Sequence, residues 1–87
     1  MTYYIKGSNG KLFEPGRKKR NYMDANGTLY TVWEKPIGDQ CIYRPYERVK
    51  GKYQRMPDTE WHPTRRDAQT ELDIEAYVHG WEETEEE

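Results

Sequence analysis

Cysteine and long apolar runs are almost absent from this sequence. Its single cysteine, Cys41, has no partner for an internal disulfide, and such sparse cysteine usage is typical of a reducing compartment. No stretch approaches the length of apolar sequence that a transmembrane helix needs, and residues 1–5 lack the charged start and apolar run of a signal peptide. These absences predict a cytoplasmic protein that does not span a membrane.

Residues that perform catalysis or bind metals are also scarce. The chain has two histidines, His62 and His79, and neither is spaced as a metal ligand with the other or with Cys41. Cys41 lies in an apparent strand, which favours a buried and unreactive thiol. We therefore expect no catalytic residue, no metal, no cofactor and no enzymatic activity.

Aromatic residues compensate for the small number of aliphatic ones. Apolar residues make up 33% of the chain and charged residues 34%, a balance that would suggest disorder without the eight Tyr, three Trp and one Phe. These large side chains can build a core and still tolerate water at one end, and about half of the tyrosines are needed for that core. We expect a single folded domain over residues 1–81 and a disordered acidic tail over residues 82–87.

Turn signals divide the first part of the chain into short strands. Asn-Gly pairs within residues 8–10 and 24–27 and the Pro36-Ile37-Gly38-Asp39 turn separate segments with strand composition. The strongest segment, Thr28 to Lys35, carries large side chains on both faces and is expected to be central. Pro45 indicates an edge or a bulge. The predicted strands cover residues 3–6, 11–14, 28–35, 40–44 with a continuation over 46–49, and 53–56.

One long helix is predicted from Thr64 to His79. Thr64 can cap its start together with Asp67, and Gly80 can end it in the left-handed conformation. Helical spacing places one set of side chains on a core stripe, namely Ala68, Leu72, Ala76 and His79. The sequence thus predicts an α+β fold, a small antiparallel sheet of four to five short strands packed by one C-terminal α-helix.

The charges are separated along the chain. Residues 1–56 contain twelve Lys and Arg against five Asp and Glu, whereas residues 57–87 contain two against eleven. The basic part interleaves cations with tyrosines, a composition that can stack bases and contact phosphates. The candidate nucleic-acid contacts are Arg17, Lys18, Lys19, Arg20, Arg44, Arg48, Lys50, Lys52 and Arg55.

The acidic part suggests a different surface. Asp67, Glu71, Asp73 and Glu75 on a rigid helix could imitate a phosphate backbone, and Ile74, Tyr77 and Val78 would add apolar contact beside them. An apolar pair such as Ile74 and Val78, away from the core stripe, is either covered by the rest of the chain or offered to a partner. Whether the protein is a monomer or a homodimer closed through this pair stays open.

The helix combines a proline-led Thr64-Arg65-Arg66-Asp67-Ala68 start with Leu72, Ala76 and a Gly80-Trp81 exit. This pattern, over roughly the last quarter of the chain, resembles the C-terminal helix of many small accessory proteins of bacterial phages and mobile elements. The resemblance implies a setting of short non-enzymatic proteins that inhibit host defence, anti-CRISPR proteins among them, which commonly occupy the site that would hold target DNA.

Two functional hypotheses follow. The first is a phage or mobile-element protein that inhibits a bacterial defence nuclease, above all a CRISPR effector, by stoichiometric binding in the cytoplasm of the host cell. The alternative is a small RNA- or DNA-binding protein that uses a basic, tyrosine-rich sheet surface.

Overall fold

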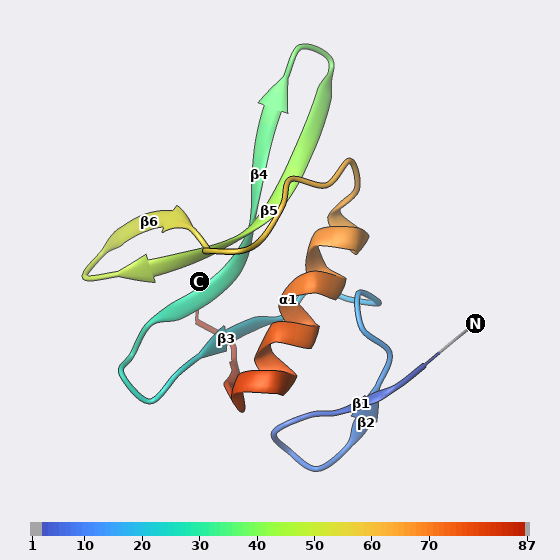
Figure 1. Ribbon diagram of the computed structural model, residues 1–87, viewed down its shortest axis with the longest axis vertical. Coiled ribbons are helices and arrows are strands. Elements are labelled where there is room, and N and C mark those ends of the chain that lie inside the picture. Colours follow the sequence, from blue (N-terminus) through green and yellow to red (C-terminus); the bar gives the residue numbers. More distant parts are fainter. Residues whose placement is uncertain (1–2, 87) are drawn as a thin grey trace.

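The computed structural model describes residues 3–86, which form two antiparallel sheets and one α-helix (Figure 1). The smaller sheet pairs β1 (Ile5–Lys6) with β2 (Leu12–Phe13). The larger sheet has the order β6-β5-β4-β3-β7, with bounds Lys52–Arg55, Gln40–Val49, Leu29–Ile37, Asn21–Met23 and Glu82–Thr84. The helix α1 (Arg65–His79) packs against the larger sheet through β4 and β5. The predicted α+β class is confirmed, and β4 is central as expected.

Both ends of α1 are capped as the sequence predicts. The Thr64 hydroxyl accepts a hydrogen bond from the Asp67 backbone N–H at 3.2 Å, which satisfies one of the free donors of the first turn. Gly80 has a φ of 73° and donates its N–H to the carbonyl of Ala76. Because the left-handed conformation strains a residue with a Cβ, glycine suits this position.

The hydrophobic core lies between α1 and one face of the larger sheet. Two alanines of the helix let the sheet approach closely, and aromatic side chains fill the remaining space. The buried cluster consists of Tyr22, Tyr30, Val32, Met56, Ala68, Leu72 and Ala76. Trp81 folds back beyond the helix and stacks on Tyr30, with ring centroids 3.6 Å apart.

The prediction that His79 belongs to the core stripe is wrong. His79 is exposed, its ring stacks on Trp81 at 5.0 Å, and its Nε2 lies 3.1 Å from Glu75 Oε2. Trp81 takes the place beside the core that the helical spacing assigns to His79. The histidine is therefore left on the outside of the tryptophan ring.

The strand β5 runs through Pro45 without a break. Tyr43 exchanges two backbone hydrogen bonds with His62, at 2.9 and 2.7 Å, on the side of β5 away from β4. Since donors alternate along a strand, the missing N–H of Pro45 would face the same side, between the His62 bridge and Arg55 at the end of β6. The proline therefore removes no hydrogen bond from the β4–β5 ladder.

Two strands of the larger sheet were not predicted. Residues 21–23 form β3, and the acidic residues 82–84 form β7, which pairs with β3 in the register Asn21↔Thr84, Tyr22↔Glu83 and Met23↔Glu82. The expectation of a disordered tail is thus wrong for residues 82–84, because β3 supplies backbone partners and Arg20 Nη1 lies 2.7 Å from Glu83 Oε1. Glu87 of that predicted tail lies outside the described residues, as do residues 1–2 of the predicted domain.

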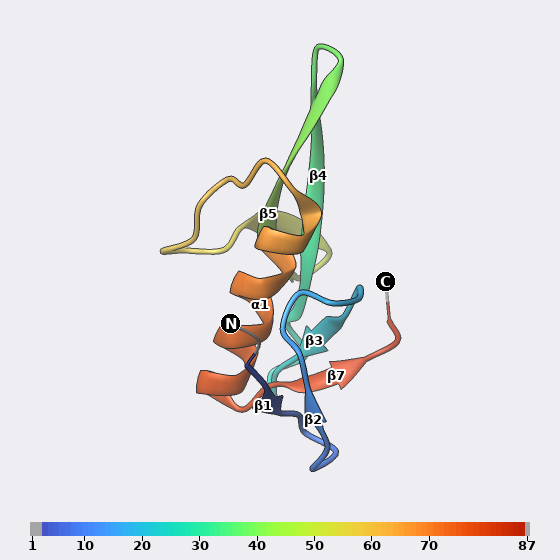
Figure 2. The ribbon, with the colours of Figure 1, turned by 90° about the vertical axis from the view of Figure 1, so that its right-hand side faces the viewer.

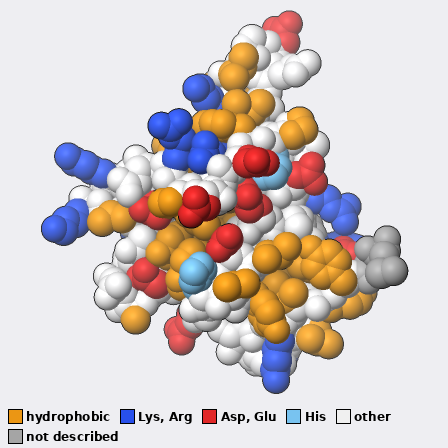
Figure 3. Space-filling view, in the orientation of Figure 1, with side chains coloured by type: hydrophobic (Ala, Val, Ile, Leu, Met, Phe, Trp, Pro, Cys, Tyr) orange, Lys and Arg blue, Asp and Glu red, His pale blue; other side chains and the backbone are white. Residues whose placement is uncertain are grey.

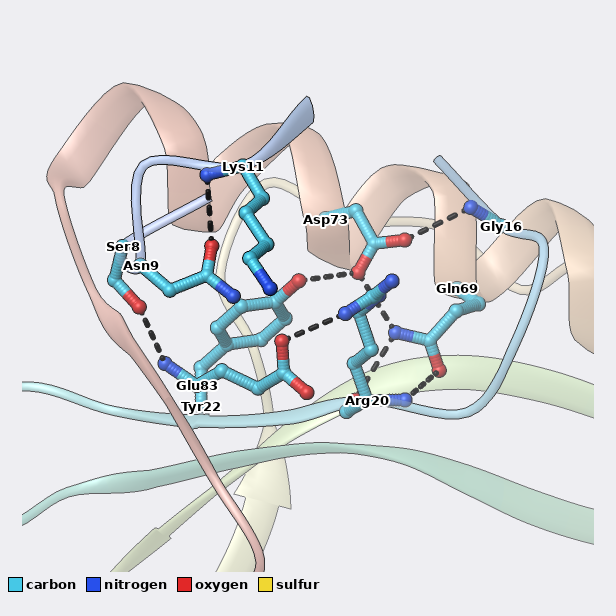
Figure 4. Close-up of polar contacts among 9 residues, drawn as sticks. All are labelled: Ser8, Asn9, Lys11, Gly16, Arg20, Tyr22, Gln69, Asp73 and Glu83. Carbon is cyan, nitrogen blue, oxygen red and sulfur yellow. Dashed lines mark hydrogen bonds and ion pairs between the residues drawn. The ribbon is translucent and has the colours of Figure 1, made fainter. Parts of the chain in front are cut away.

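A buried polar cluster joins the helix to the N-terminal part of the chain (Figure 4). Asp73 accepts hydrogen bonds from the Gly16 backbone N–H at 2.8 Å, the Tyr22 hydroxyl at 2.6 Å and Gln69 Nε2 at 2.9 Å. Burial raises the pKa of Asp73 above its ordinary value, although these donors oppose the shift, and burial together with Asp73 raises the pKa of Tyr22. Gln69 also bonds the backbone of Arg20 through both its amide atoms.

The prediction that Asp73 belongs to an exposed acidic surface is therefore wrong. Its side chain is fully buried, and its carboxylate is occupied by donors of this same chain. Two of the three donors, Tyr22 and Gly16, lie 51 and 57 positions away, so helical spacing alone did not reveal them.

We expect Asp73→Asn to lower the free energy of unfolding by about 1–3 kcal/mol, because an amide has one acceptor oxygen and turns a donor toward another donor. Urea unfolding measures this change. Glu75→Gln removes a carboxylate two positions away at the surface and should change stability by less than about 0.5 kcal/mol. Equal losses of unfolding free energy in the two variants would contradict a stabilising role for the buried polar cluster around Asp73.

We also expect Gly16→Ala to be more destabilising than Gly27→Ala. Both glycines have a φ near 80°, but a Cβ on Gly16 would lie 2.1 Å from Thr70 Oγ1 and 2.8 Å from the Arg66 carbonyl oxygen, whereas Gly27 has open space. The strained backbone costs about 1–2 kcal/mol at either site, and the clash should add about 1–3 kcal/mol at Gly16. Thermal unfolding compares the two variants, and similar losses would show that the loop is not held against α1.

Candidate nucleic-acid interface

The register of β4, β5 and β6 sorts their side chains onto two faces. Tyr30 and Val32 point to α1, so the alternate residues of β4 and their partners point to the opposite, helix-free side. Figure 2 shows α1 on one side of the larger sheet. We call the following set the aromatic–basic face: Trp33, Lys35, Arg44, Tyr46, Arg48, Tyr53, Arg55 and Trp61.

Four aromatic rings of this face touch one another in a row. Trp33 stacks on Tyr46, with ring centroids 4.9 Å apart and planes inclined by 15°. Tyr53 of β6 lies at one end of the row, with its ring centroid 5.1 Å from that of Trp33. Trp61 follows at 6.0 Å from Tyr46. Trp33 is 38% exposed and Tyr53 40%, so that both rings offer a surface to solvent. Large aromatic rings at the surface of a sheet are suited to stack on flat ligands.

Trp61 reaches this face through the segment that returns from β6 to α1. His62 forms a bridge with Tyr43 on the outer side of β5, which places the preceding residue on the helix-free side. Thr59 adds a second anchor, since its hydroxyl donates to the Met56 carbonyl at 2.6 Å and accepts from Arg44 Nε at 3.0 Å. Trp61 was not predicted as a site residue, because its position depends on this bridge.

Cations surround the rings, and the carboxylates of these strands lie elsewhere. The aromatic–basic face carries Lys35, Arg44, Arg48 and Arg55, and the first two lie 5.5 and 5.8 Å from the centre of the Trp61 ring. Among the described residues of β4, β5 and β6, the acids are Glu34 and Glu47, and both point to the helix side. Such cation–π contacts also keep the basic groups near the rings.

Of the predicted nucleic-acid contacts, Arg44, Arg48 and Arg55 belong to this face. Lys52 points to the other side of β6, and Lys50 lies in the β5–β6 turn, where Lys50 and Gly51 both have a positive φ. Residues of the turn are exposed and lie at the end of the face.

The predicted basic loop forms a separate surface. Arg17, Lys18 and Lys19 line a hollow of about 240 Å³ together with Arg65 and Arg66 of the first turn of α1. Arg20 does not belong to it, because its guanidinium pairs with Glu83 and lies 4.0 Å above the Phe13 ring. The nine predicted cations therefore do not form one continuous set.

The predicted acidic row of α1 is largely engaged within the chain. Glu71 Oε1 lies 2.9 Å from His62 Nε2 and accepts the Glu60 backbone N–H at 3.3 Å, while Glu75 pairs with His79. With Asp73 buried, Asp67 is the exposed member of the predicted set. The acids and histidines on the helix side appear in the middle of Figure 3.

The apolar part of the predicted partner surface is exposed. Ile74 is 37% exposed, Tyr77 56% and Val78 67%, all on the outer side of α1. In Figure 3 hydrophobic side chains also gather toward the β1–β2 hairpin. A cavity of about 220 Å³ lies there, lined mainly by apolar residues of β1, β2 and the end of α1, and the Asp73 carboxylate at its wall already accepts hydrogen bonds from this chain.

Comparisons with known proteins give no indication of function, so a proposal of function depends on the geometry of the structure. Within residues 3–86, no helix is long and apolar enough to cross a membrane, and no three His, Cys, Asp or Glu side chains gather as a metal site. No family model matches the chain, and neither the curated proteins nor the solved structures include a significant match.

Proposed function

We propose that this protein binds single-stranded nucleic acid through the aromatic–basic face. One observation carries the proposal: four contacting aromatic rings and four cations share a sheet face that α1 leaves open, and the carboxylates of the same strands point away from it. Sheets that combine stacking rings with a positive surface bind unpaired bases and the phosphates between them.

In this proposal, different side chains contact different parts of the ligand. Bases stack on the exposed rings of Trp33 and Tyr53, and Tyr46 supports Trp33 by stacking on it. Arg44 and Arg55 flank these rings in the register and contact phosphates. Bases of a duplex are already stacked on each other, so an unpaired strand suits this face better. Stacking accepts every base, which predicts weak sequence preference.

We expect Trp33→Ala and Tyr53→Ala each to weaken binding of a fluorescently labelled oligothymidylate about 5- to 100-fold, because stacking contributes about 1–3 kcal/mol per base. Fluorescence anisotropy measures the affinity. Tyr77→Ala removes a similarly exposed tyrosine from α1, on the opposite side of the sheet, and should leave binding unchanged. Circular dichroism checks that all three variants fold.

The same assay tests the electrostatic part. The logarithm of the binding constant should fall with the logarithm of salt concentration by about 0.7 for each phosphate contacted, and Arg55→Gln should reduce that slope by about one contact. A flat salt response, or an affinity for duplex equal to that for the single strand, would contradict the proposal.

We propose a second candidate function, stoichiometric inhibition of a bacterial defence nuclease such as a CRISPR effector in the host cytoplasm. The exposed apolar residues Ile74, Tyr77 and Val78 on the outer side of α1 favour it, since contiguous apolar side chains at a surface are typical of protein contacts. Asp67 would add charge beside them. Phosphate imitation by the whole acidic row receives less support, because Glu71, Asp73 and Glu75 have partners within the chain.

The two candidates make opposite predictions for retention of partners from a bacterial lysate. For the inhibitor, a nuclease protein should stay bound to the tagged chain after nucleic acids are digested, and Ile74→Arg with Val78→Arg should abolish retention while Trp33→Ala does not. Mass spectrometry identifies the retained protein. Retention that disappears with digestion would contradict inhibition by direct protein binding.

A further inference from the structure

The acidic C-terminal residues lie against the helix-free side of the sheet. After β7 the Glu86 carbonyl accepts a hydrogen bond from Asn21 Nδ2 at 3.0 Å, and the Glu86 N–H donates to Thr84 Oγ1 at 3.2 Å. Asn21 Oδ1 in turn accepts from the Thr31 hydroxyl at 2.8 Å, on the same side of β4 as Trp33. Figure 2 shows the C-terminal end and α1 on opposite sides of the sheet.

The position of the C-terminal residues brings the Glu86 carboxylate to Arg48 of the aromatic–basic face. Glu86 Oε1 lies 3.7 Å from Arg48 Nη2, and Arg48 is the register neighbour of Tyr53 and Leu29. Leu29 is fully buried although α1 does not cover this side, which agrees with the course of the C-terminal residues over this end. The guanidinium that would meet a phosphate beside Tyr53 thus already faces a carboxylate.

We propose that Glu85 and Glu86 form an internal competitor that limits binding of nucleic acid to the aromatic–basic face. This proposal rests on the proposed function. Glu86 occupies the phosphate position at Arg48, and the charge of Glu85 beside it repels an approaching nucleic-acid strand. The Arg48–Glu86 ion pair is weak, because half of the Glu86 side chain is exposed. A nucleic-acid strand therefore displaces Glu86 from Arg48 and is not excluded by it.

The contact between Glu86 and Arg48 suggests a role for the acidic residues at the C-terminal end of the chain. Glu82 and Glu83 lie in β7, which fixes the position of the acids that follow it, and the Glu86 side chain then pairs with Arg48 of the aromatic–basic face. Carboxylates tethered near a cationic site act at a high effective concentration, whereas the same groups in solution would not compete. The competitor should therefore reduce binding of weak, short or duplex ligands more than that of long single strands.

A chain that ends at Thr84 tests the proposal, because it keeps β7 and removes residues 85–87. It should bind the labelled oligothymidylate about 3- to 10-fold more tightly than the full chain at low salt, and the difference should shrink at high salt as the charges are screened. Its salt slope should be steeper by about one phosphate contact, because the Glu86 carboxylate no longer competes for Arg48.

Two point variants separate the Arg48 contact from a general effect of charge. Glu86→Gln and Glu85→Gln each remove one negative charge, one position apart. Glu86→Gln should raise affinity about 2- to 5-fold and Glu85→Gln less, because Glu86 faces Arg48. In addition, Arg48→Gln should weaken binding more in the shortened chain than in the full chain.

The outcomes distinguish the two proposals. If the full and shortened chains bind equally well, the competitor is overturned and the binding function stands. If neither chain binds at any salt concentration, the binding function fails and the competitor fails with it. Equal gains from Glu85→Gln and Glu86→Gln would overturn the assignment to Arg48 and leave only long-range repulsion.

Discussion

The hydrogen bonds to the Asp73 carboxylate determine how the parts of this small protein fit together. They join α1 to the turn at Gly16 and to Tyr22 of β3. A buried carboxylate is costly unless its lone pairs are satisfied, so these donors must be in place for the helix to dock. With β3 held in this way, its free side is available to β7, and the C-terminal residues acquire a defined path.

The second constraint is the register between β4 and β5. It runs without interruption from Leu29↔Arg48 to Ile37↔Gln40, although Pro45 lies within it. Because side chains alternate along both strands, one register decides at once which aromatic residues meet α1 and which lie on the open face. Tyr30 and Val32 enter the core, whereas Trp33 and Tyr46 remain outside it, and the same alternation separates Glu34 and Glu47 from Arg44 and Arg48.

The separation of charge along the sequence takes a different form in three dimensions. The acidic helix turns much of its charge inward or toward histidines, and the acidic end of the chain meets two arginines, Arg20 and Arg48. A nearly neutral protein thus has an open face with cations and rings, with carboxylates at its border. This arrangement supports a nucleic-acid surface more directly than a helix that imitates phosphates.

The class of fold, the capped helix and the central strand could be predicted from the sequence, because these depend on local spacing and turn chemistry. Thr64, Gly80 and the alternation in residues 28–35 act within a few residues of one another. About half of the tyrosines were expected in the core, whereas the structure buries Tyr22 and Tyr30 there and packs Tyr43 against them. Three features could be seen only in the folded chain, namely the burial of Asp73, the strand over residues 82–84 and the contact of Trp61 with Tyr46. Each of these depends on a partner at least 15 residues away, and neither helical nor strand periodicity contains information about such a partner.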